Sequence, residues 1–304
     1  MAYTPVGITA GTSSLDIEPA PTLDPELFDG TRLKSGIRMD LLSIISGYLD
    51  AKFRGKEQWL RTWLAGSGVS FRWHAAQDMR DLDALLGLHF IAFRGANPAY
   101  MTMGDREIAS HLNESMRQEL WPTTASWRGR YEVTWYVNPG SWDITSIKPY
   151  AAYDLIEDGW TVPPSPSAPR VDPEWEIHAA MYHQRAQTAV ERYSQALTDL
   201  QNATHPAHRV DAERRFQMSV EQAIGLFDTV HAGRKTAFSP VGQGYDDWGN
   251  YLWQQGKKAG WIPALRDIKR YHEAVQASHQ AETYGVELPS SDTLIRRAAL
   301  RYRQ

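Results

Sequence analysis

Residues 64–87, LAGSGVSFRWHAAQDMRDLDALLG, place a Gly-Ser pair ahead of two carboxylates that lead into apolar residues. The carboxylates are Asp81 and Asp83. If a strand begins here, both point to one face, because side chains alternate along a strand. Neighbouring carboxylates repel each other unless a cation lies between them, and Mg2+ favours such oxygen ligands together with substrate phosphates. The other interpretation is a helix that carries solvated acids on its outer face.

The composition indicates an ordinary globular protein. The chain has 304 residues, 42% hydrophobic and 22% charged, which is enough for two domains of roughly 100 to 200 residues each. It contains no cysteine, which excludes disulfides, thiolate metal sites and cysteine nucleophiles. No apolar run approaches the roughly 20 residues that span a bilayer, and the first residues do not read as a signal peptide. We therefore expect a cytoplasmic protein without a membrane segment.

Hydrophobic periodicity divides the chain into a mixed half and a helical half. Residues 1–36 are rich in Pro, Gly, Thr and Ser and predict an extended arm. The spacing then predicts helices over 37–53 and 105–120, and strands over 58–65, 81–93, 130–137 and 141–147. A Pro-rich stretch at 163–169 predicts a domain boundary. After it, helices are predicted over 173–202, 206–230, 245–256 and 262–281.

A third carboxylate lies on the second strand of a predicted hairpin. Arg130–Val137 is β-branched and aromatic, Asn138-Pro139-Gly140 predicts a turn, and the following strand carries Asp143. An acid inside an apolar strand is costly unless it is paired or bound to a metal. Glu132, on the partner strand, would take the place of Asp143 if the hairpin register differed; its other and favoured interpretation is a surface charge.

This order of motifs resembles the nucleotidyltransferase superfamily of the DNA polymerase beta type, including CCA-adding-like and cyclic-nucleotide-synthase-like enzymes. The resemblance rests on Gly66-Ser67, on Asp81-Leu82-Asp83 and on Asp143, and it covers roughly residues 37–165. It implies an α+β fold with a nucleotidyltransferase-type mixed sheet and helices, followed by an all-helical second domain. The predicted domains are the arm at 1–36, a catalytic domain at 37–165 and a helical domain at 170–304. The chain departs from the family pattern at Arg80, where a small hydroxyl residue is usual.

The resemblance also implies a mechanism. Asp81, Asp83 and Asp143 would be the catalytic residues and the ligands of two Mg2+ ions about 4 Å apart, with Mn2+ as a substitute. Asp143 would also help to deprotonate the acceptor. Gly66, Ser67 and Arg72 would bind the nucleotide, with Ser67 and the turn gripping the phosphates of a nucleoside triphosphate. A nucleoside monophosphate would pass to a hydroxyl acceptor, either an RNA 3′ end or a second nucleotide, and pyrophosphate would leave.

The helical half offers further nucleotide-binding candidates. Arg234 and Lys235 are cations for the triphosphate, Ser239 bears a hydroxyl, and Tyr245 could stack on a base. From Arg234 to the last residue the chain has eleven Lys or Arg against seven Asp or Glu, which favours an RNA or nucleotide acceptor. The other interpretation of these four candidates is a helix–helix loop, and that of the basic residues is a solvated helix face. The alternative for the whole chain is a non-enzymatic nucleic-acid-binding or assembly protein with a nucleotidyltransferase-like fold.

Overall fold

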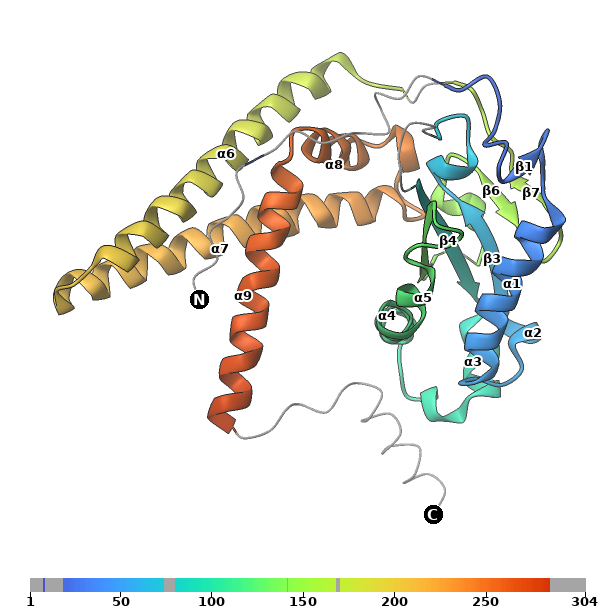
Figure 1. Ribbon diagram of the computed structural model, residues 1–304, viewed down its shortest axis with the longest axis horizontal. Coiled ribbons are helices and arrows are strands. Elements are labelled where there is room, and N and C mark those ends of the chain that lie inside the picture. The colour runs from blue at the N-terminus through green and yellow to red at the C-terminus, as the bar shows by residue number, and fades with distance from the viewer. Residues whose placement is uncertain (1–7, 9–18, 74–79, 141, 168–169, 285–304) are drawn as a thin grey trace. The chain divides into compact units, whose positions relative to one another are not determined.

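The computed structural model describes residue 8 and residues 19–73, 80–140, 142–167 and 170–284. These residues fall into two compact units. The sheet unit comprises residues 19–167 with 238–240, and the helical unit comprises residue 8 with 170–237 and 241–284. The predicted α+β class is confirmed, because a five-stranded mixed sheet with flanking helices precedes a run of long helices (Figure 1).

The elements of the sheet unit follow one another from the N-terminal side. They are β1 (Phe28–Asp29), β2 (Arg32–Leu33), α1 (Ser35–Asp50), α2 (Lys56–Trp59), β3 (Leu60–Ala65), the 3-10 turn η2 (Ser67–Val69), β4 (Arg80–Leu88), α3 (Phe90–Ala96), η3 (Pro98–Tyr100), α4 (Asp105–Ser115), the π-helical η4 (Met116–Leu120), α5 (Trp121–Thr124), β5 (Tyr131–Val137), η5 (Ile144–Ile147), β6 (Ala152–Asp154) and β7 (Gly159–Val162).

The sheet has the strand order β5-β4-β3-β6-β7. Strand β4 pairs antiparallel with β3 and parallel with β5, whereas β6 and β7 continue antiparallel on the other side of β3. One face of the sheet packs on the main core, to which α1 contributes Ile37, Leu41, Ile45 and Leu49 at intervals of four residues. Helix α4 joins the same core, and the Tyr48 hydroxyl of α1 donates to Ser115 Oγ at 2.7 Å.

The other face of the sheet is covered only in part. Trp63, Leu85, Ile144 and Ile147 form a smaller cluster on it. Strand β5 shows the consequence, because its side chains alternate between buried and half-buried along the whole strand. A strand with one face in the core and one face partly open has this pattern.

Several sequence predictions for this unit need correction. The strand predicted over 58–65 is β3 and starts at Leu60, because Lys56–Trp59 is helical. Strand β4 ends at Leu88 and does not reach residue 93: the His89 ring accepts a hydrogen bond from the Ala92 N–H and caps α3. Residues 20–36 are also not a plain extended arm, since they contain β1, β2 and the start of α1, and bury Leu23, Leu27 and Leu33 in the core. Residues 1–7 and 9–18 of that arm lie outside the described residues.

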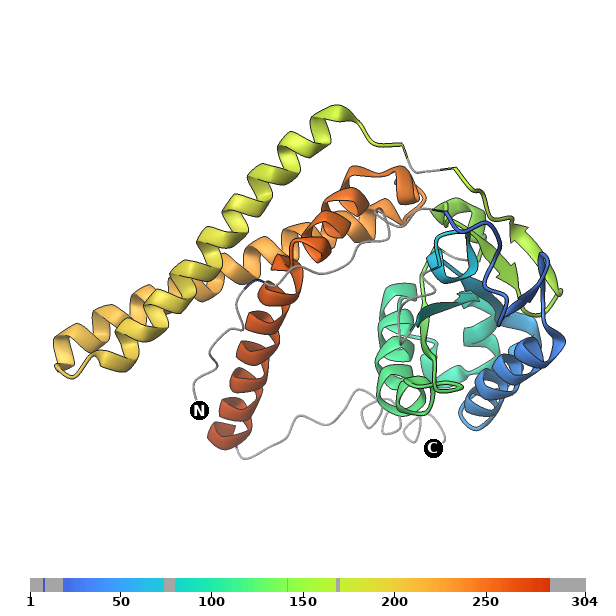
Figure 2. The same cartoon turned by 45° about the horizontal axis from the view of Figure 1, so that its top comes forward.

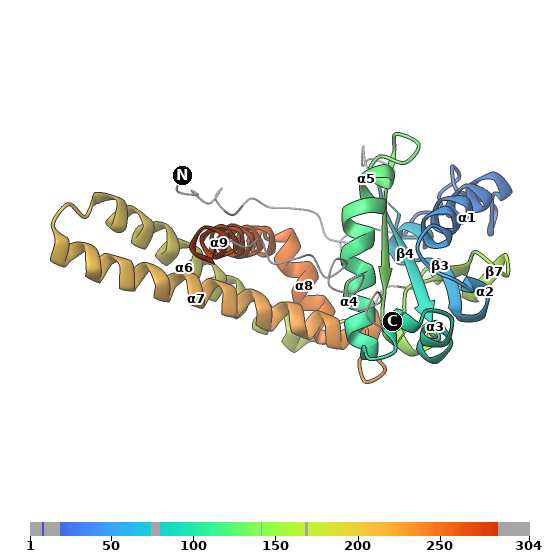
Figure 3. The same cartoon turned by 90° about the horizontal axis from the view of Figure 1, so that it is seen from below.

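The helical unit consists of α6 (Pro173–Asn202), α7 (Pro206–Ala237), the short turn η6 (Gly244–Asp246), α8 (Trp248–Lys258) and α9 (Trp261–Tyr284). Asp172 caps α6 by accepting from the Glu174 N–H, and Pro173 occupies the first helical position, as the sequence predicts. Helices α6 and α7 lie side by side as an antiparallel pair in every view (Figure 2). Helix α9 crosses this pair and is seen almost end-on from below (Figure 3). None of the helices in the described residues has an apolar stretch long enough to cross a membrane.

Candidate functional site

The acid pair lies on the partly open face of the sheet. Asp81 and Asp83 are the second and fourth residues of β4, and the pleat directs Leu82 and Ala84 between and beyond them into the core. Asp81 is exposed and Asp83 is half-buried. The strand interpretation of this segment is therefore correct, and the helix interpretation is wrong.

Strand β5 adds a carboxylate and a hydroxyl to the same face. Its parallel register pairs Asp81 with Glu132 and Asp83 with Thr134. Residues paired in this way point to the same side of a sheet. The Trp121 indole N–H donates to Glu132 Oε1 at 2.9 Å, which fixes that carboxylate. Glu132 is thus the acid that stands opposite Asp81, through a parallel pairing with β4 and not through the predicted hairpin.

The Gly-Ser turn touches the acid strand directly. Gly66 follows β3 with φ = +87°, a conformation that favours glycine. A Cβ on Gly66 would lie 2.6 Å from Asp83 Oδ2, and a Cβ on Gly68 would lie 2.5 Å from the Asp81 carbonyl oxygen. Both distances are too short for a side chain, so only glycine allows the turn to approach this closely. Ser67 begins the 3-10 turn between these two glycines and is half-exposed.

The loop that joins the turn to β4 is described as far as Trp73. Arg72 is buried and its guanidinium lies 5.9 Å from the centre of the Tyr150 ring. Its backbone N–H donates to Ser70 Oγ at 3.0 Å. The turn, Arg72 and the acid pair therefore belong to one continuous segment, as the sequence predicts. Residues 74–79 lie outside the described residues.

A buried ion pair anchors the start of both acid-bearing strands. Arg80 precedes Asp81, and its Nη1 donates to Asp24 Oδ2 at 2.7 Å. The Tyr131 hydroxyl, which precedes Glu132, donates to the same oxygen at 2.9 Å. Burial would lower the pKa of Arg80, but Asp24 and Tyr131 outweigh it and raise that pKa. Burial and the bond to Asp24 raise the pKa of the Tyr131 hydroxyl. The sequence predicts no role for Arg80, whereas the fold shows that its long side chain reaches the buried carboxylate of Asp24.

Asp143 is not the third acid of this group. Residues 144–147 form the 3-10 turn η5, not a strand, so the part of 141–147 that the structure describes makes no hairpin with β5. Asp143 is exposed and caps η5 by accepting from the N–H and the hydroxyl of Thr145, at 3.1 and 2.6 Å. A short Asp side chain that bonds the backbone two residues later favours a turn over a strand. The preceding Trp142 contacts Arg61 and His89, which lie toward the end of the sheet away from Asp81.

The remaining predicted nucleotide-binding residues surround the end of α7. Arg234 lies 5.0 Å from the centre of the Trp253 ring, Lys235 is exposed in the last turn of α7, and Tyr245 lies in η6, where its carbonyl accepts from Asn250 Nδ2. These three belong to the helical unit. Ser239 belongs to the segment 238–240 of the sheet unit, and the Asn138 side chain donates to the neighbouring Phe238 carbonyl at 3.1 Å.

The carboxylate oxygens of Asp81 and Asp83 are ligands of the type that a hard divalent cation prefers. Among the residues that the structure describes, no group of three or more His, Cys, Asp or Glu side chains is gathered closely enough to hold a metal ion. Mg2+, however, is commonly bound by one or two carboxylates, with substrate phosphates and water completing its shell. Asp81 and Asp83 fit an ion that arrives with a phosphorylated substrate. They do not form a three-carboxylate site with Asp143.

Comparison with known proteins adds no assignment. No family model matches the chain, and neither a curated protein nor a solved structure is detectably similar to it. The function must therefore be argued from the site itself.

Proposed function

We propose that this protein is a metal-dependent nucleotidyltransferase that moves a nucleoside monophosphate from a nucleoside triphosphate to a hydroxyl acceptor. One observation carries the proposal: Gly66 lies against the Asp83 carboxylate, and Asp81, Asp83 and Glu132 share one partly open face of the sheet. Two carboxylates on one face of a strand provide the oxygen ligands that Mg2+ takes together with substrate phosphates. The element order also supports the resemblance to the nucleotidyltransferase superfamily, since a helix precedes β3 and the Gly-Ser turn precedes β4.

Each residue has a distinct part in this chemistry. Asp81 and Asp83 would hold the Mg2+ ion or ions. When bound, Mg2+ neutralises charge on the phosphates and orients the reacting oxygens. Ser67 would donate from its hydroxyl to the terminal phosphates. Glu132 would accept the proton of the attacking hydroxyl, the role that the sequence assigns to Asp143.

The reaction balances without any further reactant. The acceptor oxygen forms a bond to the α-phosphorus, and the bond from that phosphorus to the oxygen bridging the β-phosphate breaks. The proton of the acceptor passes to a carboxylate, and pyrophosphate carries away the electron pair of the broken bond. Arg234, Lys235, Ser239 and Tyr245 remain predicted contacts for the nucleotide.

Binding of the triphosphate tests this proposal before any acceptor is known. Calorimetric titration with each of the four ribonucleoside triphosphates should give heat in excess Mg2+ and none in excess EDTA. The Asp81→Asn/Asp83→Asn variant should lose the Mg2+-dependent part. Equal binding by both proteins, with and without Mg2+, would overturn the assignment of these carboxylates.

A further inference from the structure

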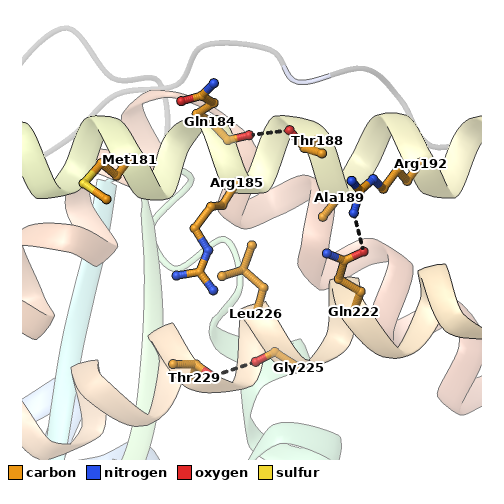
Figure 4. Close-up of a pocket in the computed structure, with 10 residues that line it drawn as sticks. All are labelled: Met181, Gln184, Arg185, Thr188, Ala189, Arg192, Gln222, Gly225, Leu226 and Thr229. Atoms are coloured by element: carbon orange, nitrogen blue, oxygen red, sulfur yellow. Dashed lines mark hydrogen bonds between the residues drawn. The ribbon is translucent and has the colours of Figure 1, made fainter.

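A cationic groove runs between α6 and α7. It has a volume of about 450 Å3, and the side chains of Arg185 and Arg192 enter it from α6 (Figure 4). Met181 and Leu226 contribute apolar surface, and Gln222 contributes an amide from α7. Two arginines and no Asp or Glu line it. The two helices carry eight Asp or Glu against seven Lys or Arg in total, so the lining of this groove is positive although the helix pair as a whole is not.

Both guanidiniums keep donors for a ligand. In the described part of the chain, neither Arg185 nor Arg192 forms a salt bridge. Arg185 lies over the Tyr182 ring, 5.2 Å from its centre. Arg192 Nη1 donates to Gln222 Oε1 over a long 3.4 Å. Because a guanidinium has five N–H donors, one weak bond leaves most of them for an anion. By contrast, Arg209 and Arg214 on α7 are paired with Glu213 and Asp211.

The spacing of the two arginines selects an extended anion. They are seven residues apart on one helix, which places them on the same face about 10 Å apart along the axis. Side chains that start this far apart on one face can each meet a different phosphate of the same ligand. They match a polymer that carries charge at close intervals, and a nucleic-acid strand has one phosphate per roughly 3.4 Å of helix axis. The apolar and amide groups between them can contact sugars.

We propose that this groove binds the sugar-phosphate backbone of a single-stranded RNA. Its role as the site of the acceptor strand rests on the proposed function, whereas the binding itself does not. Arg185 and Arg192 would each contact a phosphate, with Gln222 released from Arg192 or rearranged around the bound strand. The substrate class that follows is a polynucleotide acceptor, which is favoured here over a free second nucleotide.

The test measures binding of a fluorescently labelled single-stranded oligoribonucleotide to the full chain by anisotropy, over a range of salt concentrations. Each phosphate contact on a single strand contributes about 0.7 to the slope of log K against log salt. The Arg185→Gln/Arg192→Gln variant should therefore bind more weakly and lose about 1.4 from that slope. The matched control is Arg209→Gln/Arg214→Gln, which removes the same charge from arginines that are already paired; it should bind nearly as the wild type does. Unchanged melting temperatures would establish that both variants are folded.

Three results would overturn the proposal. They are a wild-type slope in Arg185→Gln/Arg192→Gln, an equal loss in the control variant, and competition by polyglutamate that matches competition by unlabelled RNA, which would favour an acidic protein partner. Failure of the proposed function can be distinguished from failure of the RNA-binding proposal. Absence of nucleotidyl transfer together with arginine-dependent RNA binding would refute the proposed function and leave this groove standing.

Discussion

The carboxylate of Asp24 and the guanidinium of Arg80 form a buried ion pair, with 2.7 Å between Oδ2 and Nη1, at the first residue of the strand that carries the acid pair. Asp24 is 1% exposed. Because Tyr131 donates to the same carboxylate, one side chain from the N-terminal segment joins the first residues of β4 and β5. Asp81 and Glu132 are the next residues along these two strands and are paired with each other.

Removing one partner of a buried pair leaves the other charge uncompensated. We therefore expect Asp24→Asn to lower the free energy of unfolding by about 3–5 kcal/mol, measured by urea denaturation. The matched control is Glu114→Gln, which breaks an exposed pair with Arg117 in the same unit and should cost less than about 1 kcal/mol. Equal losses in the two variants would show that the Asp24–Arg80 pair is no anchor.

The Gly66 turn should be sensitive to a single methyl group. Gly66→Ala and Gly30→Ala both place alanine at positive φ. Gly30→Ala should lose about 1–2 kcal/mol of stability, and Gly66→Ala should lose more, because its φ of +87° and ψ of −161° lie in a region that is essentially restricted to glycine. Only Gly66→Ala also pushes on the Asp83 carboxylate, because Gly30 has open space where its Cβ would lie. Mg2+-dependent triphosphate binding should thus weaken at least about tenfold in Gly66→Ala and stay unchanged in Gly30→Ala, a difference of about 1.4 kcal/mol. Similar binding by both variants would separate the turn from the site.

Substitutions of Glu132 and of Asp143 should affect the rate of nucleotidyl transfer differently. If Glu132 takes the acceptor proton, Glu132→Gln should lower the rate of nucleotidyl transfer by about 10²-fold or more, with little change in triphosphate binding. Asp143→Asn should leave the rate within about twofold, since its side chain caps a turn. Trp121→Phe removes the indole N–H that holds Glu132 but keeps the carboxylate, and should give a smaller loss than Glu132→Gln. A large loss in Asp143→Asn alone would restore the sequence prediction.

The helical unit should lose stability in acid. Burial lowers the pKa of His231 and of His272, and for His231 the cations Lys235, Arg234 and Lys269 lower it further. Since the folded pKa lies below the unfolded value of about 6.5, protonation favours the unfolded chain. Stability is complete above about pH 6.5 and falls as the pH drops through the folded pKa. Melting temperatures at graded pH should show this fall, and His231→Gln/His272→Gln should flatten it. The exposed pair His205→Gln/His208→Gln is the control; an equally flattened profile there would contradict the assignment.

Sequence patterns identify the site residues that are close together in the chain, and miss the residue that joins the site through strand pairing. The Gly-Ser pair and Asp81-x-Asp83 lie within one contiguous segment, so alternation along a single strand was enough to place both aspartates on one face. Periodicity and the Asp172 cap also locate α6, whereas α7 continues to Ala237, beyond its predicted end at residue 230. Glu132 joins the site only because β5 pairs parallel with β4, and no property of the segment 130–137 specifies that partner.

Two errors have a common physical cause. Asp143 and His89 each use a short polar side chain to bond a nearby backbone N–H, which ends extended structure where the apolar pattern predicts that it continues. Asp24 was hidden for a different reason. The segment that carries it lacks any periodicity, and its importance comes from a contact with a residue 56 positions away.

Nucleotidyl transfer itself is the most direct test of the central claim. The full chain should be incubated with each α-labelled ribonucleoside triphosphate, Mg2+ and a single-stranded RNA with a free 3′ hydroxyl, beside the Asp81→Asn/Asp83→Asn variant. The account predicts label in the RNA and release of pyrophosphate for the wild type, and loss of both for the variant. Transfer that persists in the variant, or its absence in a wild type that also shows no Mg2+-dependent triphosphate binding, would contradict it.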